Sequence, residues 1–166
     1  MCWNIIHIKN GKCQEVLDYF NAQKEVHAFK PMIEKWFSSS FKKEYQKVEM
    51  YPDYIFINSS LSHEEFNEKF HDVFLSIDGF AKLMKYDDIV PLDKREEDFL
   101  DKMLDGSDTI KHSIGRMVDS ILVVEQGPLV GMEDMIKKTN RHKRLAFVDG
   151  GILGLMKIPL EVVSKS

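Results

Sequence analysis

The sequence contains little cysteine, no long apolar run and no recognisable leader segment. Its two cysteines, Cys2 and Cys13, are too few for a disulfide framework and lack the paired spacing of a metal site. No apolar run approaches the roughly 20 residues that span a bilayer. Because the N-terminus also lacks a basic segment followed by an apolar one, we expect a cytoplasmic protein with no membrane partner.

Motifs of enzyme active sites are missing as well. There is no glycine-rich phosphate loop of the Walker type, and no Ser-His-Asp or Cys-His set has a recognisable local signature. The segment from His63 to His71 resembles the zinc motif H-E-x-x-H, but Asn67 stands where the second histidine belongs. On a helix, His63 and His71 would lie about 12 Å apart, too far to share a metal. The sequence therefore predicts no catalytic residues, no metal site and no cofactor.

The composition is that of a folded protein with an uneven distribution of charge. The 166 residues are 43% hydrophobic and 11% aromatic, which indicates globular structure. From Gly115 onward, eight lysines and arginines outnumber six aspartates and glutamates, a net charge of +2, whereas the preceding residues carry −6. The last part of the chain can therefore attract nucleic acid electrostatically, and the acidic first part cannot.

The first hundred residues alternate between strand and helix patterns. Ser62 with Glu65, and Asp93 with Glu96, match the capping box that begins a helix. Tyr54–Ile57 is apolar almost throughout and is expected to be a central strand. The remaining patterns predict strands over 3–8 and 79–84 and a helix over 12–22. Two further segments are expected to be extended: 26–36, which Pro31 interrupts, and 45–58. A polar loop is expected at 38–43. This order predicts an α+β unit with helices covering an antiparallel sheet.

A different pattern follows a predicted linker that begins near Leu104. Short apolar segments, separated by glycine-containing turns, predict strands over 117–124, 132–137, 145–148, 155–159 and 160–163. Closely spaced short strands of this kind favour a small five-stranded β-barrel.

A compact basic segment lies between apolar runs in this second part. Ile121–Val124 and Leu145–Val148 flank a Gly-Pro turn and then a loop with five fixed cations and one histidine in eight residues. We expect a β-hairpin with this charge at its tip. Such a tip suits an RNA backbone, because arginine binds phosphate bidentately or reads guanine edges, and a histidine can stack on a base. The candidate RNA-binding residues are Lys137, Lys138, Asn140, Arg141, His142, Lys143 and Arg144.

Four segments in a fixed order resemble the NusG family of transcription elongation factors. They are WNIIHIKNGK at the N-terminus, VEMYPDYIFI, GFAKLMKYDDIVPLDKREEDFLDKML and the KOW-like GPLVGMEDMIKK. The resemblance implies an NGN-type polymerase-binding domain over residues 1–105, a linker over 106–114 and a KOW domain with an SH3-like barrel over 115–166.

The resemblance also implies site residues and a partner. Trp3, Tyr51 and Tyr54 match the positions that form the family's pocket for the clamp helices of RNA polymerase. The loop from Trp36 to Lys43, with Ser38–Ser40 at its centre, matches a hairpin that approaches the polymerase gate loop; it can also be a solvated turn. From the residues alone, the favoured interpretation of the three aromatic side chains is that they are core residues of the sheet, and only the resemblance favours an interface.

Within the family, NRHKRLAFV and the ending LEVVSK resemble the specialised paralogs called LoaP. That resemblance implies an antitermination factor whose KOW domain binds an RNA hairpin in the nascent transcript; we also expect a monomer. The alternative is a general elongation factor whose KOW domain binds a protein, either Rho or a small-subunit ribosomal protein.

Overall fold

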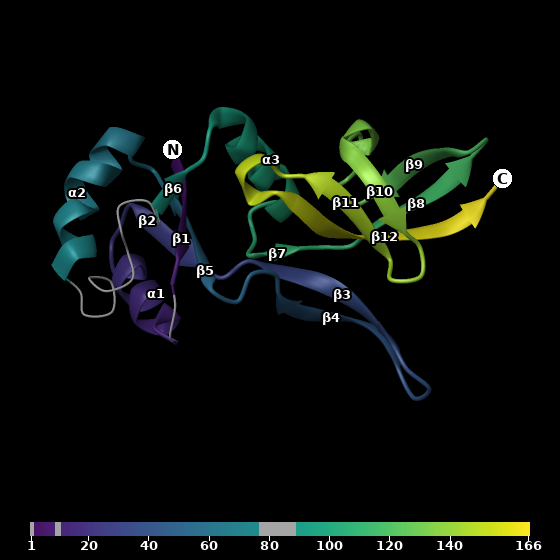
Figure 1. Cartoon of the computed structure of the whole chain (residues 1–166), viewed down its shortest axis with the longest axis horizontal. Coiled ribbons are helices and arrows are strands. Elements are labelled where there is room, and N and C mark those ends of the chain that lie inside the picture. The colour runs from purple at the N-terminus through teal and green to yellow at the C-terminus, as the bar shows by residue number, and fades with distance from the viewer. Residues whose placement is uncertain (1, 9–10, 77–88) are drawn as a thin grey trace. The chain divides into compact units, whose positions relative to one another are not determined.

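The computed structural model of the chain describes residues 2–8, 11–76 and 89–166, which form two compact units (Figure 1). The first unit comprises Met1–Pro31 and Tyr51–Glu97, and the second comprises Met32–Met50 and Asp98–Ser166. The hairpin of strands β3 (Met32–Ser38) and β4 (Lys43–Glu49) therefore groups with the C-terminal residues, although it lies within the first 105 residues of the chain.

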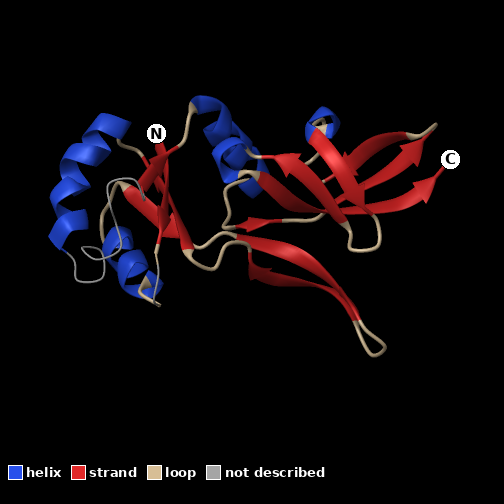
Figure 2. Cartoon of the chain, in the orientation of Figure 1, coloured by secondary structure: helices blue, strands red, loops and turns tan. Residues whose placement is uncertain are grey.

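The first unit is built on a four-stranded antiparallel sheet in the order β2-β5-β1-β6. Its strands are β1 (Cys2–His7), β2 (Val26–Phe29), β5 (Tyr54–Ser59) and β6 (Ile89–Pro91), and its helices are α1 (Cys13–Asn21) and α2 (His63–Ser76). Both helices lie on one side of the sheet (Figure 2). As the sequence predicts, Tyr54–Ile57 is central in the sheet.

The core of this unit lies between the sheet and the two helices. Side chains of Ile6 on β1 and Ile55 on β5 face each other in register and pack with Phe20 of α1 and Phe66 of α2. All four are fully buried or nearly so. Because side chains alternate along a strand, the residues between them point to the opposite face of the sheet, where the aromatic residues of the N-terminal motif lie.

Both predicted capping boxes are present. At the start of α2, the Glu65 backbone N–H donates to Ser62 Oγ at 3.1 Å, and the Ser62 N–H donates to Glu65 Oε2 at 3.2 Å. At the start of α3 (Lys94–Leu104), Asp93 and Glu96 make the same reciprocal pair at 2.8 and 3.1 Å. These bonds satisfy backbone donors that have no partner inside the helix. The strand predicted over 79–84 lies outside the described residues.

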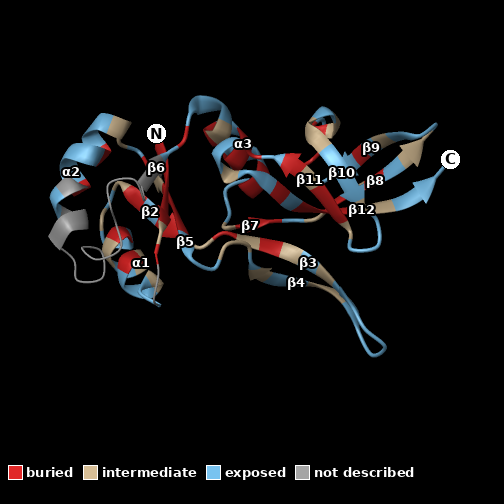
Figure 3. Cartoon of the chain, viewed as in Figure 1, coloured by how far each residue is buried: buried red, intermediate tan, exposed pale blue. Residues whose placement is uncertain are grey.

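The second unit contains two sheets. A three-stranded sheet has the order β4-β3-β7, in which β7 (Thr109–Ile110) pairs parallel with β3. A five-stranded sheet has the order β10-β11-β12-β8-β9. Its strands are β8 (Ser113–Val118), β9 (Ile121–Gln126), β10 (Ile136–Asn140), β11 (Leu145–Asp149) and β12 (Leu155–Lys165). Figure 3 shows buried positions along these strands and an exposed outer half of the β3–β4 hairpin.

The α+β class and the C-terminal group of five strands are confirmed, but the closed barrel is wrong. In the described residues, β9 and β10 are the edges of an open sheet and do not pair with each other. The long strand β12 pairs antiparallel with β11 through its first half and parallel with β8 through its second half, and so joins the two halves of the sheet.

Several predicted strand boundaries are also wrong. The segment 117–124 is interrupted at Asp119 and Ser120, whose φ angles of 51° and 67° form a tight turn between β8 and β9. Two successive positive φ values define the type I′ hairpin turn, which Asn-Gly usually forms. The expected strand over 132–137 begins with the short 3-10 helix η2 (Glu133–Met135) and continues as β10.

Residues 155–163 form one strand, not two. Pro159 is the last β12 residue paired with β11, and Leu160 is the first paired with β8. Proline has no N–H to donate, so it is tolerated in this strand where the pairing changes partner. The Leu160 N–H, in turn, donates to the Arg144 carbonyl at 2.9 Å. None of the helices in the described residues combines the length and hydropathy of a bilayer-spanning segment.

Candidate functional site

The face of the first sheet opposite α1 and α2 carries a continuous set of aromatic contacts. Tyr51 packs edge-on against Tyr54, with ring centroids 5.8 Å apart, and stacks on Phe56 at 6.3 Å. Phe56 contacts Phe29 at 6.1 Å, and Phe29 contacts Trp3 edge-on at 5.8 Å. The structure thus brings the three predicted polymerase-binding residues into one aromatic set, which we call the aromatic face.

The members of the aromatic face differ in exposure. Trp3 is 4% exposed and Phe56 is fully buried, whereas Tyr54 is 38% exposed. Tyr51 is half-buried, and burial, with a smaller contribution from Tyr54, raises the pKa of its phenol. His7 stacks on Tyr54 at 4.7 Å and extends the accessible end of the set. Tyr54 is therefore the most accessible of the three predicted residues, whereas Trp3 lies within the fold.

The predicted RNA-binding residues lie on the β10–β11 hairpin. Its turn is held by the Lys143 backbone N–H, which donates to Asn140 Oδ1 at 3.0 Å, and by the Arg144 N–H, which donates to the Arg141 carbonyl at 3.3 Å. Arg144 has a φ of 52°, a left-handed conformation that closes the turn. The charged tip is confirmed as a hairpin tip, but Ile121–Val124 belongs to β9 at the other edge of the sheet.

Most of the basic side chains on this hairpin are accessible. Lys137, Lys138, Arg141, His142 and Lys143 are exposed, and Asn140 is half-buried. Among them, Arg141 makes one long hydrogen bond, from Nη2 to the Val162 carbonyl at 3.4 Å. A guanidinium bound only to one neutral carbonyl keeps most of its donors for a phosphate. We refer to these five exposed basic side chains as the basic tip.

Arg144 differs from the basic tip because its side chain is engaged inside the unit. Its Nη1 lies 3.1 Å from Glu161 Oε1 and donates to the Tyr45 hydroxyl at 3.2 Å. The guanidinium carbon lies 3.6 Å from the centroid of the Trp36 ring, a cation–π contact. Three-quarters of the Arg144 side chain is buried. These contacts favour a role in positioning the hairpin over direct contact with RNA.

The same contacts define a cluster that sequence reasoning missed. Tyr45 stacks on His112 with centroids 3.9 Å apart and planes 7° from parallel, and its hydroxyl donates to Glu161 at 3.3 Å. Glu34 accepts the His112 backbone N–H at 2.9 Å and lies 3.3 Å from the ring Nδ1, without hydrogen-bond geometry to that nitrogen. The arginine cluster, as we call it, consists of Trp36, Tyr45, His112, Arg144, Glu161 and Glu34.

Part of the arginine cluster could have been predicted from the sequence. Trp36 and Tyr45 stand at matching distances from the polar loop, which is the spacing of a cross-strand pair in a hairpin, and they are paired in β3 and β4. Their other partner, Arg144, is 99 residues from Tyr45 in the chain. Spacing along a sequence cannot show a contact of that range.

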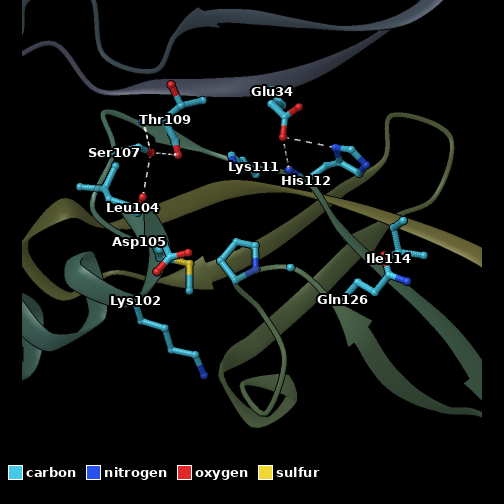
Figure 4. A pocket seen from close by; sticks show the side chains of 13 residues that line it. Glu34, Lys102, Leu104, Asp105, Ser107, Thr109, Lys111, His112, Ile114 and Gln126 are labelled. Atoms are coloured by element: carbon cyan, nitrogen blue, oxygen red, sulfur yellow. Dashed lines mark hydrogen bonds and ion pairs between the residues drawn. The ribbon is translucent and has the colours of Figure 1, made fainter.

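A cavity of about 750 Å³ lies beside the arginine cluster in the second unit (Figure 4). Its walls include Glu34 and His112 on one side and Lys102, Ser107 and Gln126 on the others. Its polar groups are largely engaged: Lys102 Nζ donates to the Val130 carbonyl at 2.7 Å, and Ser107 Oγ lies within bonding distance of two carbonyls. In the described residues, no group of three or more histidine, cysteine or acidic side chains could hold a metal ion.

Comparison with known families agrees with the N-terminal motifs. The family model described as "Transcription termination factor nusG" matches residues 1–100. The match includes the whole aromatic face and the β3–β4 hairpin, and it ends within α3, before the five-stranded sheet. No curated protein matches the chain significantly. Proteins of the matched family are transcription factors, not enzymes, and generally bind RNA polymerase. Because the match covers more than half of the chain, the protein belongs to the NusG family of transcription elongation and termination factors.

Proposed function

We propose that this protein is an antitermination factor of the LoaP type. Its N-terminal unit binds the clamp helices of RNA polymerase through Trp3, Tyr51 and Tyr54, and thereby suppresses pausing and termination. Its C-terminal sheet acts as a KOW domain and binds an RNA hairpin in the leader of the nascent transcript. The two contacts act together, because an RNA-bound factor has a high effective concentration at the polymerase that made that RNA.

The observation that carries the RNA half of the proposal is the accessibility of the basic tip. Five basic side chains of the β10–β11 hairpin, histidine included, are exposed, while the chain as a whole has a net charge of −4. Positive charge gathered on one hairpin of an acidic protein supports a local, oriented contact with phosphates. Arg141 is the side chain we assign to bidentate recognition, since Arg144 is already paired with Glu161.

The aromatic face supports the polymerase half. An accessible tyrosine backed by buried rings provides a large, rigid contact area at low entropic cost, as interface anchors do. The family assignment gives the partner class, because family members generally bind RNA polymerase.

The experiment is an electrophoretic mobility shift of the full-length protein against a pool of randomised RNA hairpins, followed by titration of a recovered hairpin. Arg141→Ala should weaken binding, and the logarithm of the wild-type association constant should fall with log salt at a slope near −3 to −4 if about four phosphates are contacted. Arg116→Ala is the matched control, because Arg116 is an exposed arginine of β8 that pairs with Glu125 at 2.7 Å. Equal affinity of wild type and Arg141→Ala contradicts the assignment of the tip.

One observation favours the alternative, a KOW domain that binds a protein. Ile121 and Val123 on the edge strand β9 are 67% and 39% exposed. An edge strand with exposed apolar side chains is a surface on which a partner protein can dock. Capture of purified Rho or of a small-subunit ribosomal protein by the full-length chain, lost in Ile121→Ser, with no hairpin bound, would decide for this alternative.

A further inference from the structure

A half-buried phenylalanine on the five-stranded sheet lies between lysines on both neighbouring strands. In the ladder of antiparallel pairs, Phe147 of β11 is opposite Lys138 of β10 on one side and Lys157 of β12 on the other. Directly opposite residues have Cβ atoms about 5 Å apart and point to the same face. Lys138 Nζ lies 5.4 Å from the centroid of the Phe147 ring. Both lysines are exposed.

A bulge in β10 adds a third lysine to this group. Between the pairs Ile136–Val148 and Lys138–Phe147, β10 advances by two residues while β11 advances by one. Lys137 and Lys138 therefore share one opposing residue, as the two residues of a β-bulge do. Bulges redirect side chains and are common beside functional sites. We name Phe147 with Lys137, Lys138 and Lys157 the lysine-flanked ring.

We infer that the lysine-flanked ring is a stacking platform for an unpaired RNA base, an inference that rests on the proposed RNA-binding function. The face of Phe147 would take the base, and the ammonium groups on its two sides would bind the phosphates before and after that nucleotide. Aromatic platforms in a positively charged groove are the common solution for single-stranded nucleic acid. Lys138 Nζ, now at the ring, moves to a phosphate when the base takes its place.

The position of the ring relative to the basic tip supports the same occupant. The Lys138–Phe147 pair is two residues along the ladder from the Asn140–Leu145 pair that ends the strands, about 7 Å at 3.4 Å per residue. Beyond that pair lie the exposed Arg141 and Lys143. Lys137 and Lys138 belong to both the basic tip and the lysine-flanked ring, so the ring, Arg141 and Lys143 form one positively charged path on which a loop nucleotide and its neighbours can lie.

The combination of an aromatic ring with flanking lysines favours RNA over an acidic protein segment as the occupant. The nearest acidic residue along β11 is Asp149, and its Oδ1 accepts the Gly151 backbone N–H at 2.9 Å. An acidic peptide would satisfy the lysines but would have no planar group for the ring. A nucleotide satisfies both, because every base has a π-face and every linkage has a phosphate.

A simpler explanation exists for the lysines and the bulge. β10 is an edge of the sheet, and edge strands often carry lysines and bulges that prevent pairing with another chain. That explanation gives Phe147 no role in binding, so the ring is where the two explanations differ.

The test uses the full-length protein and an adenosine-loop RNA hairpin in which 2-aminopurine replaces one loop base. Stacking on Phe147 should quench 2-aminopurine fluorescence when wild-type protein binds. Phe147→Leu should abolish the quenching and weaken binding by about 5- to 150-fold, whereas Phe147→Trp should keep both the quenching and the affinity. Lys157→Gln should weaken binding and reduce the salt slope by about one.

Matched controls separate stacking from loss of fold. Phe41→Leu removes a phenyl ring that is 99% exposed in the β3–β4 loop, and Lys165→Gln removes an exposed lysine at the far end of β12. Neither should change affinity or quenching. The far-UV circular dichroism and thermal midpoint of Phe147→Leu must match those of wild type. If Phe147→Leu is unfolded, the other proteins decide: quenching by wild type and by Phe147→Trp, together with weaker binding by Lys157→Gln, supports the platform. Binding by wild type without quenching overturns it.

The outcomes distinguish this inference from the proposed function. Absence of binding by wild type to any hairpin, in this assay and in the randomised pool, overturns the proposed function and with it the platform. Wild-type binding that Phe147→Leu leaves unchanged, without quenching, overturns the platform alone and leaves the basic tip as the site. Equal affinity for the hairpin and for a blunt duplex of the same stem would also overturn the platform alone, because a duplex offers no unpaired base.

Discussion

The aromatic face of the first unit and the arginine cluster of the second contain similar rings held by different forces. In the aromatic face, Trp3, Phe29 and Phe56 contact one another edge to face and are less than a tenth exposed. In the arginine cluster, the rings of Trp36 and Tyr45 are arranged around the cation of Arg144, which Glu161 neutralises.

The difference shows which cluster can be a binding surface. Burial of apolar rings is non-directional, so one ring at the margin of the face, Tyr54, can stay exposed while the others hold it in place. Charged hydrogen bonds are directional, and Arg144, Glu161 and the Tyr45 hydroxyl already bond one another. The first arrangement leaves an accessible anchor, whereas the second uses its arginine for internal structure.

The largest expected effect tests the division of roles within the aromatic face. Trp3→Ala should lower the free energy of unfolding by about 3–5 kcal/mol, because it leaves a cavity among buried rings. Tyr54→Ala should cost less than about 1 kcal/mol of stability, since its side chain is partly exposed, but at least about 2 kcal/mol of polymerase affinity if it is the anchor. Urea unfolding and binding to purified core polymerase provide the two measurements.

Tyr19→Ala is a suitable control for that pair, since Tyr19 is a partly buried tyrosine on α1, whose buried face packs against the other side of the sheet. It should not affect polymerase binding. If Tyr54→Ala binds polymerase as tightly as wild type does, the clamp-binding pocket is not at this face. Loss of affinity in Tyr19→Ala equal to that in Tyr54→Ala would show that the loss reflects stability and not contact.

A smaller effect is expected in the arginine cluster. Arg144→Ala removes the cation–π contact with Trp36 and leaves Glu161 with one partner, which should cost about 2 kcal/mol of unfolding free energy. Arg144→Lys keeps the charge but not the planar stack, and should recover less than half of that loss. Both variants should retain the wild-type salt dependence of RNA binding, in contrast to Arg141→Ala.

The opposite result for Arg141 and Arg144 would exchange the roles assigned to them. A stable Arg144→Ala variant with a salt slope reduced by about one would mean that Arg144 contacts phosphate and that its pairing with Glu161 gives way on binding. Chemical denaturation and salt titration of the same protein samples make the comparison direct.

Much of the first unit was predictable because its signals are local. The capping boxes at Ser62 and Asp93 satisfy backbone donors three residues away, and the apolar run at Tyr54–Ile57 marks a strand buried on both faces. The aromatic face was predictable through the family resemblance, which the family match over residues 1–100 supports. Whether Phe56 is a core or a rim residue was not predictable, because the alternation of side chains along a strand gives the face of a residue but not what covers that face.

The second unit was less predictable because its determinants are conformational or distant in sequence. The turn at Asp119–Ser120 depends on two left-handed residues that are neither glycine nor asparagine. The sequence predicted two strands that meet after Pro159, but a single strand continues there by changing its pairing partner. The basic tip could be located from composition alone, whereas the separate role of Arg144 depends on Glu161 and on a hairpin from the first third of the chain.

The smallest effect concerns the hydroxyl groups of two tyrosines. Tyr45→Phe removes one hydroxyl that bonds both Arg144 and Glu161, at 3.2 and 3.3 Å, and should cost about 1 kcal/mol. Tyr51→Phe should be nearly neutral, because the structure gives the Tyr51 hydroxyl no hydrogen bond among the described residues.

The two tyrosines should nevertheless behave alike at high pH. Burial raises the pKa of both phenols above the model-peptide value of 10.0. In that situation the unfolded chain loses its phenolic protons first, so the phenols' contribution to stability is constant below about pH 10 and falls as pH rises through the folded pKa. Each phenylalanine variant should therefore show a shallower loss of stability above pH 10 than wild type, measured by urea unfolding across that range. An equally steep loss in Tyr51→Phe would mean that its ring is not desolvated in the folded protein and that the aromatic face is more open than its packing indicates.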